Sequence, residues 1–238
     1  LFTNTTGASN VAMGHNALFA NTTGDYNVAI GENALDANTT ANSNTAIGFD
    51  AMSANTTGTQ NTALGANALE YVQTGNDNTG LGYVALMNAG GSQNTAIGSR
   101  ALQDMTTGDD NTAVGYHALH TNTTASDNTA VGSGALYLNT TGSNNTAVGH
   151  NALDANTTGG SNTCIGRNSL GANTTGTANA AVGLSALESN TTASNNTALG
   201  YFALLSNTTG TQNTAVGSQA LDAGNHTNCN AFGYQALS

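Results

Sequence analysis

The residues of this chain that could hold a metal ion are few and scattered. Its 238 residues include five His, two Cys and thirteen Asp or Glu. His117 and His120 lie three residues apart, and Asp104, Asp109 and Asp110 form the densest acidic group. Zinc needs three or four protein ligands, calcium needs six or more oxygens, and the glycine- and aspartate-rich nonapeptide of calcium-binding β-rolls is absent from the sequence. We therefore predict solvated surface side chains, no metal site and no cofactor.

The sequence also carries no recognisable catalytic constellation. It has no phosphate-binding loop, no Cys–His pair and no nucleophile elbow. Polysaccharide-cleaving enzymes with a β-helix fold need acid and base carboxylates beside Arg or Lys in a groove. Arg100 and Arg167 are the only Arg or Lys residues, and neither belongs to such a group. We predict that the chain is not an enzyme.

Composition excludes two further classes of partner. Only 6% of the residues are charged and the formal net charge is −11, so a cationic surface for nucleic acid is excluded. The longest apolar runs fall far below the roughly 20 residues of a membrane span, and no basic-plus-apolar signal peptide opens the chain. We expect no nucleic-acid partner and no membrane insertion by this segment.

All of these residues are positioned by one short repeat, which fills the chain. Its unit reads N-T-A-V-G-x-x-A-L-x-x-N-T-T-G-x-x, with positions numbered one to seventeen from the first Asn. The spacing is 17 residues, with two intervals of 16. The glycine at position five recurs at Gly14, Gly31, Gly48, Gly65, Gly82, Gly98, Gly115, Gly132, Gly149, Gly166, Gly183, Gly200, Gly217 and Gly233. Residues 1–238 are therefore predicted to be a single repeat domain, without caps, from a longer fibre.

A 17-residue repeat predicts one coil of a parallel β-solenoid, because repeats of paired helices need about 33 to 47 residues. We expect an all-β fold of about fourteen coils, each with two short strands, Thr-Ala-Val and Ala-Leu, separated by turns. Position four is always apolar and position nine is Leu except at Met52. Strand alternation then predicts positions four and nine inside the coil. This core ladder includes Ile30, Leu35, Ile47, Val114, Leu119, Val131, Leu136, Val148 and Leu153.

The same alternation leaves the alanine columns at positions three and eight outside the coil. Two large side chains per coil make a thin core for the backbone that must be ordered, so we expect a second buried face against other chains. Small side chains let backbones approach closely. The alternative is that alanine merely fits a narrow interior. The candidate interchain face comprises Ala29, Ala34, Ala46, Ala113, Ala118, Ala130, Ala147, Ala152 and Cys164.

The remaining chemistry lies at the ends and corners of the coil. Cys164 and Cys229 are four coils apart, about 19 Å at the spacing of paired strands, which forbids a disulfide within one chain. If position three lined an axis between chains, copies of Cys164 would cluster there. Ten Asn-Thr-Thr corners match the acceptor pattern for N-glycosylation, although turn formation explains the same residues. The candidate surface for binding a ligand is an aromatic column at position six, comprising Tyr83, Tyr116, Tyr201 and Tyr234.

The motifs resemble those of a known family. Residues 10–14 (N-V-A-M-G) and 27–31 (N-V-A-I-G) are similar to the N-S-V-A-I-G motif of trimeric autotransporter adhesin heads of the YadA type. Residues 145–149 (N-T-A-V-G) also resemble repeats of phage tail-fibre proteins with a C-terminal chaperone domain. The resemblance covers the whole chain and implies a left-handed parallel β-roll, assembled as a side-by-side homotrimer. Two departures are the longer Asn-Thr-Thr-Gly corner and Thr in place of Val at position two.

The resemblance implies a structural or adhesive segment of a trimeric fibre, an adhesin head or a tail-fibre shaft. Its partners would be two further copies of itself and a host cell-surface glycan or matrix protein. Its location would be extracellular, on a cell or virion surface. The alternative function is an ice-binding β-solenoid that uses rows of threonine.

Overall fold

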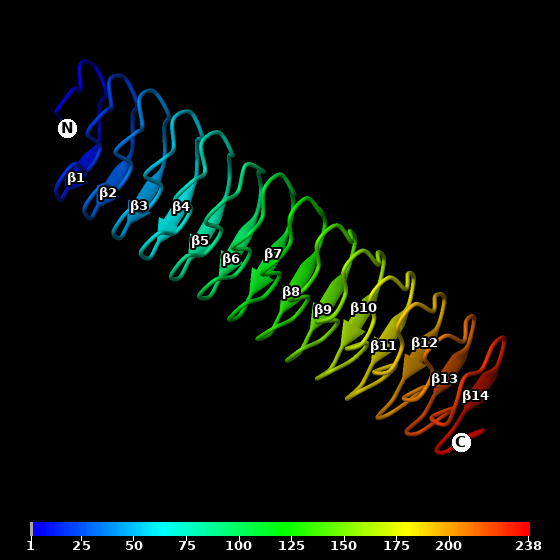
Figure 1. The fold of residues 1–238 in the computed structure, drawn as a ribbon. Coiled ribbons are helices and arrows are strands. Elements are labelled where there is room, and N and C mark those ends of the chain that lie inside the picture. The colour runs from blue at the N-terminus through cyan, green and yellow to red at the C-terminus, as the bar shows by residue number, and fades with distance from the viewer. Residues whose placement is uncertain (1) are drawn as a thin grey trace. The chain divides into compact units, whose positions relative to one another are not determined.

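The computed structural model describes residues 2–238, in which the regular structure consists of fourteen three-residue β-strands and no helix (Figure 1). Consequently, none of these residues belongs to a helix that could cross a membrane. The strands are β1 (Val11–Met13), β2 (Val28–Ile30), β3 (Thr45–Ile47), β4 (Thr62–Leu64), β5 (Thr79–Leu81), β6 (Thr95–Ile97), β7 (Thr112–Val114), β8 (Thr129–Val131), β9 (Thr146–Val148), β10 (Thr163–Ile165), β11 (Ala180–Val182), β12 (Thr197–Leu199), β13 (Thr214–Val216) and β14 (Asn230–Phe232).

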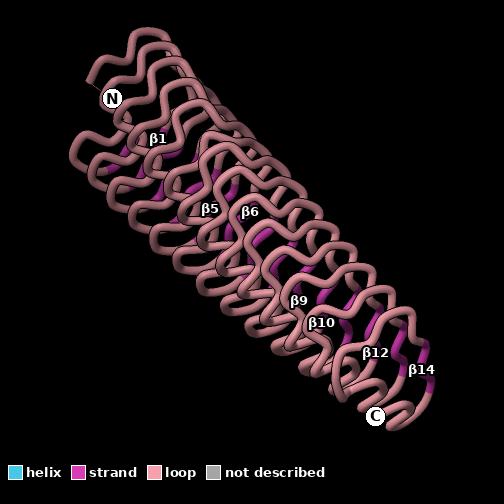
Figure 2. The backbone as a smooth tube through the Cα atoms, turned by 45° about the vertical axis from the view of Figure 1, so that its right-hand side comes forward, coloured by secondary structure: helices cyan, strands magenta, loops and turns pink. Residues whose placement is uncertain are grey.

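The chain forms two compact units with the same internal design. The first unit comprises residues 2–117 and 122–124 and contains β1–β7, and the second comprises residues 118–121 and 125–238 and contains β8–β14. Within each unit, each strand pairs in parallel with the strand of the next coil, as in Ala29↔Ala46 and Ala147↔Cys164. The strands lie on one side of the coils and loops complete each turn (Figure 2). Each unit is therefore a parallel β-solenoid with one coil per repeat.

Each coil has one strand rather than the two that the sequence predicts. Positions two to four form the strand, where backbone bonds such as Thr45 N–H to Asn61 O (2.9 Å) and Gly48 N–H to Ile30 O (2.8 Å) join successive coils. The Ala-Leu segment at positions eight and nine is a turn. In that turn Leu35 has φ of 52° and Leu153 has φ of 55°. The expected second strand is wrong because these residues adopt the left-handed conformation, which a strand excludes.

Glycine at position five is required by both conformation and space. Gly149 has φ of 138°, a value that side chains disfavour, and a Cβ there would lie 2.6 Å from the carbonyl oxygen of Gly166 in the next coil. The same close approach recurs along the column. The invariant glycine thus permits the close approach of successive coils at the end of each strand.

The core of each coil contains leucine, alanine and asparagine. Leu35, Leu119, Leu136 and Leu153 are fully buried, as the repeat predicts. Two asparagine columns, at positions one and twelve, are also buried along most of the chain. In the position-twelve column Asn38 Nδ2 donates to Asn21 Oδ1 (2.9 Å). The interior is therefore narrower and more polar than a purely aliphatic ladder.

The expected assignment of inside and outside is wrong at positions three, four and eight. Ile30, Ile47, Val114, Val131 and Val148 are only half-buried, on the outer side of the strand, so they are not core. The proposed interchain alanines lie in the core of a single chain instead. These fully buried residues are Ala29, Ala34, Ala46, Ala113, Ala118, Ala130, Ala147, Ala152 and Cys164.

Space inside the coil explains this reversal. A Cβ built at Gly80, which replaces the usual alanine at position three, would overlap Leu69 Cδ1 from position nine of the preceding coil. Positions three and nine therefore face each other across the interior. With leucine filling one side, the opposite position accommodates a residue no larger than alanine or cysteine, and the bulkier aliphatic residue at position four must point outward.

Candidate binding surface

The outer face of the strands exposes apolar side chains in both units. We call the side chains at positions two and four of β1–β14 the strand face. None of these side chains is buried, and Leu64, Ile97, Ile165 and Leu199 at position four are exposed. Position two is usually threonine. The strand face thus carries one file of mostly hydroxyl-bearing side chains and one file of aliphatic side chains.

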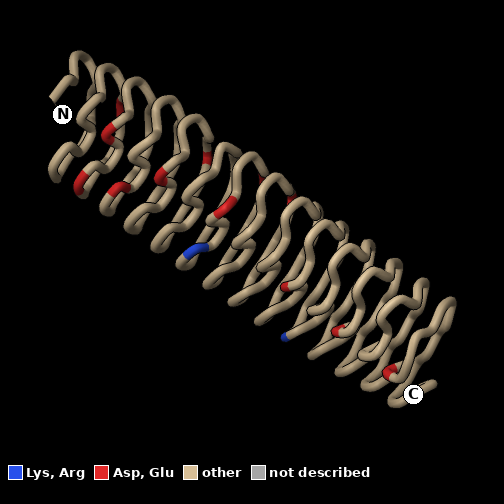
Figure 3. The backbone as a smooth tube through the Cα atoms, viewed as in Figure 1, with Lys and Arg blue, Asp and Glu red and all other residues tan. Residues whose placement is uncertain are grey.

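The strand face has no charged residue, although the chain has a net charge of −11. All thirteen carboxylates and both arginines lie in the turns and loops (Figure 3). Net negative charge of this size opposes association between copies wherever charged surfaces meet. The strand face is a surface on which two copies can meet without bringing fixed charges together, and it is one that also exposes apolar side chains.

The tyrosines at position six lie on the surface, where the sequence predicts them. Tyr83, Tyr116, Tyr201 and Tyr234 are all exposed. Two of them stack on the next residue in the chain: Tyr116 on His117 and Tyr201 on Phe202, each with ring centroids 3.9 Å apart. Position six is two residues beyond position four, so the column runs beside the strand face.

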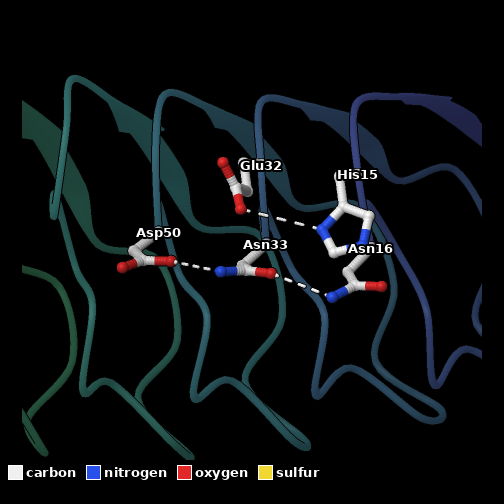
Figure 4. Close-up of polar contacts among 5 residues, drawn as sticks. All are labelled: His15, Asn16, Glu32, Asn33 and Asp50. Carbon is white, nitrogen blue, oxygen red and sulfur yellow. Dashed lines mark hydrogen bonds and ion pairs between the residues drawn. The ribbon is translucent and has the colours of Figure 1, made fainter.

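Next to this column, polar side chains at position seven connect successive coils. Asn16 Nδ2 donates to Asn33 Oδ1 (3.2 Å), and Asn33 Nδ2 donates to Asp50 Oδ1 (2.9 Å) (Figure 4). His15 Nδ1 and Glu32 Oε1, at position six of two successive coils, are 3.7 Å apart, and both side chains are largely exposed. This row supplies hydrogen-bonding groups along one side of the aromatic column.

The Asn-Thr-Thr corner is occupied by its own hydrogen bonds. Asn156 Nδ2 donates to Asn139 Oδ1 (2.8 Å) and to Gly159 O (2.9 Å), and both asparagines are fully buried. The hydroxyl of Thr157 donates to Thr174 O in the next coil (3.0 Å). A buried asparagine cannot be glycosylated in the folded coil, and the position-thirteen hydroxyls are used within the chain. The corner is therefore a structural joint.

The two cysteines are free and are not joined in a disulfide. Cys164 is buried at position three, between Ala147 and Ala181, and Cys229 is half-buried. Burial raises the pKa of the Cys164 thiol far above its ordinary value. Clustering of Cys164 on an axis between chains is excluded, because its side chain points into its own coil.

The histidines and carboxylates weighed as metal ligands in the sequence analysis do not form a cluster that could hold an ion. Among residues 2–238 no group of three or more His, Cys, Asp or Glu side chains could hold one ion. His117 stacks on Tyr116, whereas the His120 ring lies 5.3 Å from that of Tyr137. The two histidines thus have different aromatic neighbours.

One shallow pocket in the second unit was not foreseen from the sequence. It has a volume of about 270 Å³ and is lined by Asn151, Asp154, Asn168, Gly171, Ala172 and Glu188. Gly171 occupies position ten between the two acidic residues, so the missing side chain opens the hollow. Burial, reinforced by the charge of Glu188, raises the pKa of Asp154, while hydrogen bonds from the Asp154 and Ala155 N–H groups and the charge of His150 lower it. The glycine at position ten is the sequence feature that could have indicated this pocket.

Comparisons with known proteins do not assign a family or a function to the chain. No protein-family model matches the chain. No curated protein matches it either.

Proposed function

We propose that this chain is a segment of an extracellular surface fibre in which copies associate side by side through the strand face. The assembly is a homotrimer of left-handed coils, as in the adhesin heads that the motifs resemble. The fibre stands on a cell or virion surface. It carries, or holds away from that surface, the region that contacts a host glycan or matrix protein.

The observation that carries this proposal is a file of exposed apolar side chains on an uncharged face of an acidic chain. Exposed aliphatic side chains at position four recur in both units, while every charge lies elsewhere. A contiguous apolar surface on a soluble protein is typically an interaction site. The sequence placed the contact between copies at the alanine columns, but a single chain already buries these columns. We therefore place the contact between copies at the strand face.

The dimensions of the face indicate how much of it must be used. A strip three residues wide and seven coils tall measures roughly 10 Å by 34 Å, or about 340 Å². This projected area is under half of the ~800 Å² that one partner contributes to a standard interface. The strand face of one unit alone therefore falls short of a standard interface.

The test is the oligomeric state of the purified chain, measured by multi-angle light scattering and sedimentation. We expect a trimer for the wild type and a monomer for Ile165→Glu, which places a carboxylate on the strand face. Leu138→Glu is the matched control, because Leu138 is 43% exposed and Ile165 is 42% exposed, but Leu138 lies at position eleven in a loop. A wild-type monomer at micromolar concentrations would reject the proposal.

A second candidate function, ice binding, is favoured by the threonine file at position two. Five successive strands of the first unit begin with Thr45, Thr62, Thr79, Thr95 and Thr112. Their hydroxyl and methyl groups repeat at about the 4.8 Å spacing of paired strands. The adjacent file varies among Ile, Leu and Val, which makes the surface uneven. Thermal hysteresis by the wild type that is lost on replacing these threonines would favour this function over the fibre.

A further inference from the structure

In the first unit, position six carries an aromatic ring on every second coil. Phe49, Tyr83 and Tyr116 are exposed to nearly the same degree, 50%, 52% and 55%. The coils between them carry the small residues Ala66 and Ser99. Rings of similar exposure therefore alternate with gaps along the column, which we call the aromatic comb.

Backbone hydrogen bonds keep the comb in line. The N–H at position seven donates to the carbonyl at position six of the preceding coil at each step of the comb. These bonds are Asn67 N–H to Phe49 O (2.9 Å), Val84 N–H to Ala66 O (3.0 Å), Arg100 N–H to Tyr83 O (2.9 Å) and His117 N–H to Ser99 O (3.2 Å). The position-six residues are thus in register over five coils, and successive rings are about 10 Å apart, twice the spacing of paired strands.

That period matches one class of ligand. In an extended 1,4-linked β-glycan each sugar is turned over relative to the one before it, so every second sugar presents the same C–H face. One disaccharide of such a glycan is close in length to the ~10 Å step of the comb. The electron-rich face of an aromatic ring attracts the polarised C–H bonds of a sugar face. Alternate sugars can stack on the three rings, while the gaps at Ala66 and Ser99 admit the substituents of the intervening sugars.

The flanking row supplies the polar contacts that orient such a ligand. Position seven carries Asp50, Asn67, Arg100 and His117 beside the comb, with the buried Val84 next to the middle ring. Carboxylate, amide, guanidinium and imidazole groups can bind sugar hydroxyls. The stacking of His117 against Tyr116 also limits the orientations of that ring.

We propose that the aromatic comb binds an extended 1,4-linked β-glycan along the coil axis. The proposal rests on the fibre function above and names the ligand class that the fibre contacts. Tyr201 and Tyr234, on either side of Ser218, form a shorter comb of the same period in the second unit.

The experiment measures binding of the full chain to insoluble cellulose and chitin by pull-down, and to cellohexaose and chitohexaose by calorimetry. Starch and a 1,3-linked β-glucan serve as ligands of different period. We expect binding to at least one of the 1,4-linked β-glycans, and the cellulose and chitin arms distinguish their two sugars. Tyr83→Ala removes the middle ring and should weaken binding by about tenfold, because one stacked face of ~50 Å² is lost.

Two further variants test the spacing itself. Tyr71→Ala is the matched control, because Tyr71 is also 52% exposed but lies at position eleven, away from the comb; it should bind as the wild type does. The double variant Tyr83→Ser with Ser99→Tyr keeps the composition and breaks the period, so it should bind as weakly as Tyr83→Ala. A double variant that binds normally, or equal binding to starch, would overturn the proposal.

The oligomeric state separates this inference from the fibre function. A wild-type trimer that binds none of the 1,4-linked β-glycans overturns the ligand and leaves the fibre intact. A monomer that binds them with the expected dependence on Tyr83 supports the comb and rejects the association. If Tyr83→Ala dissociates the trimer without a glycan present, the comb is a contact between copies and the glycan proposal is wrong.

Discussion

At the scale of single residues, the coil depends on backbone conformations that most side chains avoid. Leu35 and Leu153 have φ near +50°, which costs roughly 1–2 kcal/mol for an L-residue. Both side chains are fully buried, and burial of leucine contributes about 1.5–3 kcal/mol. Burial of the leucine side chain thus offsets the conformational cost of its own left-handed backbone, which explains why position nine is nearly always leucine.

Asp154 is a residue whose charge the folded state disfavours. Burial raises its pKa above the ordinary 3.8 and Glu188 adds to this, so between the unfolded and folded pKa values the folded state binds more protons. Stability therefore falls as pH rises through that window. We predict that Asp154→Asn raises the melting temperature at about pH 7 and has little effect near pH 3, where both states are protonated. Thermal unfolding followed by circular dichroism at both pH values measures this, and equal stabilisation at each would implicate packing rather than charge.

At the scale of the elements, the turn places its leucine in the core and the strand places its position-four residue outside, and single substitutions distinguish the two elements. Leu153→Ala should lower the free energy of unfolding by about 3 kcal/mol, because it leaves a cavity in the coil. Val148→Ala, on the strand face, should cost less than about 1 kcal/mol at concentrations where the chain is monomeric. Urea unfolding of both variants, which lie in the same unit, provides the comparison. If Val148→Ala lowered the free energy of unfolding more than Leu153→Ala does, position four would belong to the core after all.

The period of the repeat predicts the solenoid, but the phase of the strand does not follow from it. Alternation allows either Ala147 or Val148 to face inward, and hydrophobicity favours the valine. The structure selects the alanine, because Leu at position nine already fills the narrow interior, a constraint between coils that no single repeat displays. The aromatic column was predictable, because Tyr83 and Tyr116 occupy a variable position. The left-handed conformation of residues such as His117 was not predictable, because no glycine occupies these positions to indicate it.

At the scale of the whole molecule, each unit is a stack in which a coil bonds mainly to its neighbours, so the buried asparagine columns link one coil to the next. The position-twelve column is interrupted in the first unit by Val72, Ala89 and Met105. Two position-twelve acceptors are buried without a hydrogen-bond partner: Asn55 Oδ1, which precedes this interruption, and Asn190 Oδ1 in the second unit. An unpaired buried acceptor costs about 1–3 kcal/mol, so the link to the next coil is weakened at one position-twelve asparagine in each unit.

The charge of the chain predicts how salt affects its association. In the proposed assembly each copy carries −11 and meets its neighbours through an uncharged face, so charges oppose assembly only at longer range. Raising the ionic strength from about 0.01 M to 0.15 M shortens the Debye length from roughly 30 Å to 8 Å and screens this repulsion. We therefore expect association, measured by sedimentation equilibrium, to tighten as salt is added, while Ile165→Glu stays monomeric at both ionic strengths. Weakening by salt would mean instead that ion pairs involving Arg100 or Arg167 hold the copies together, in which case the apolar strand face is not the interface.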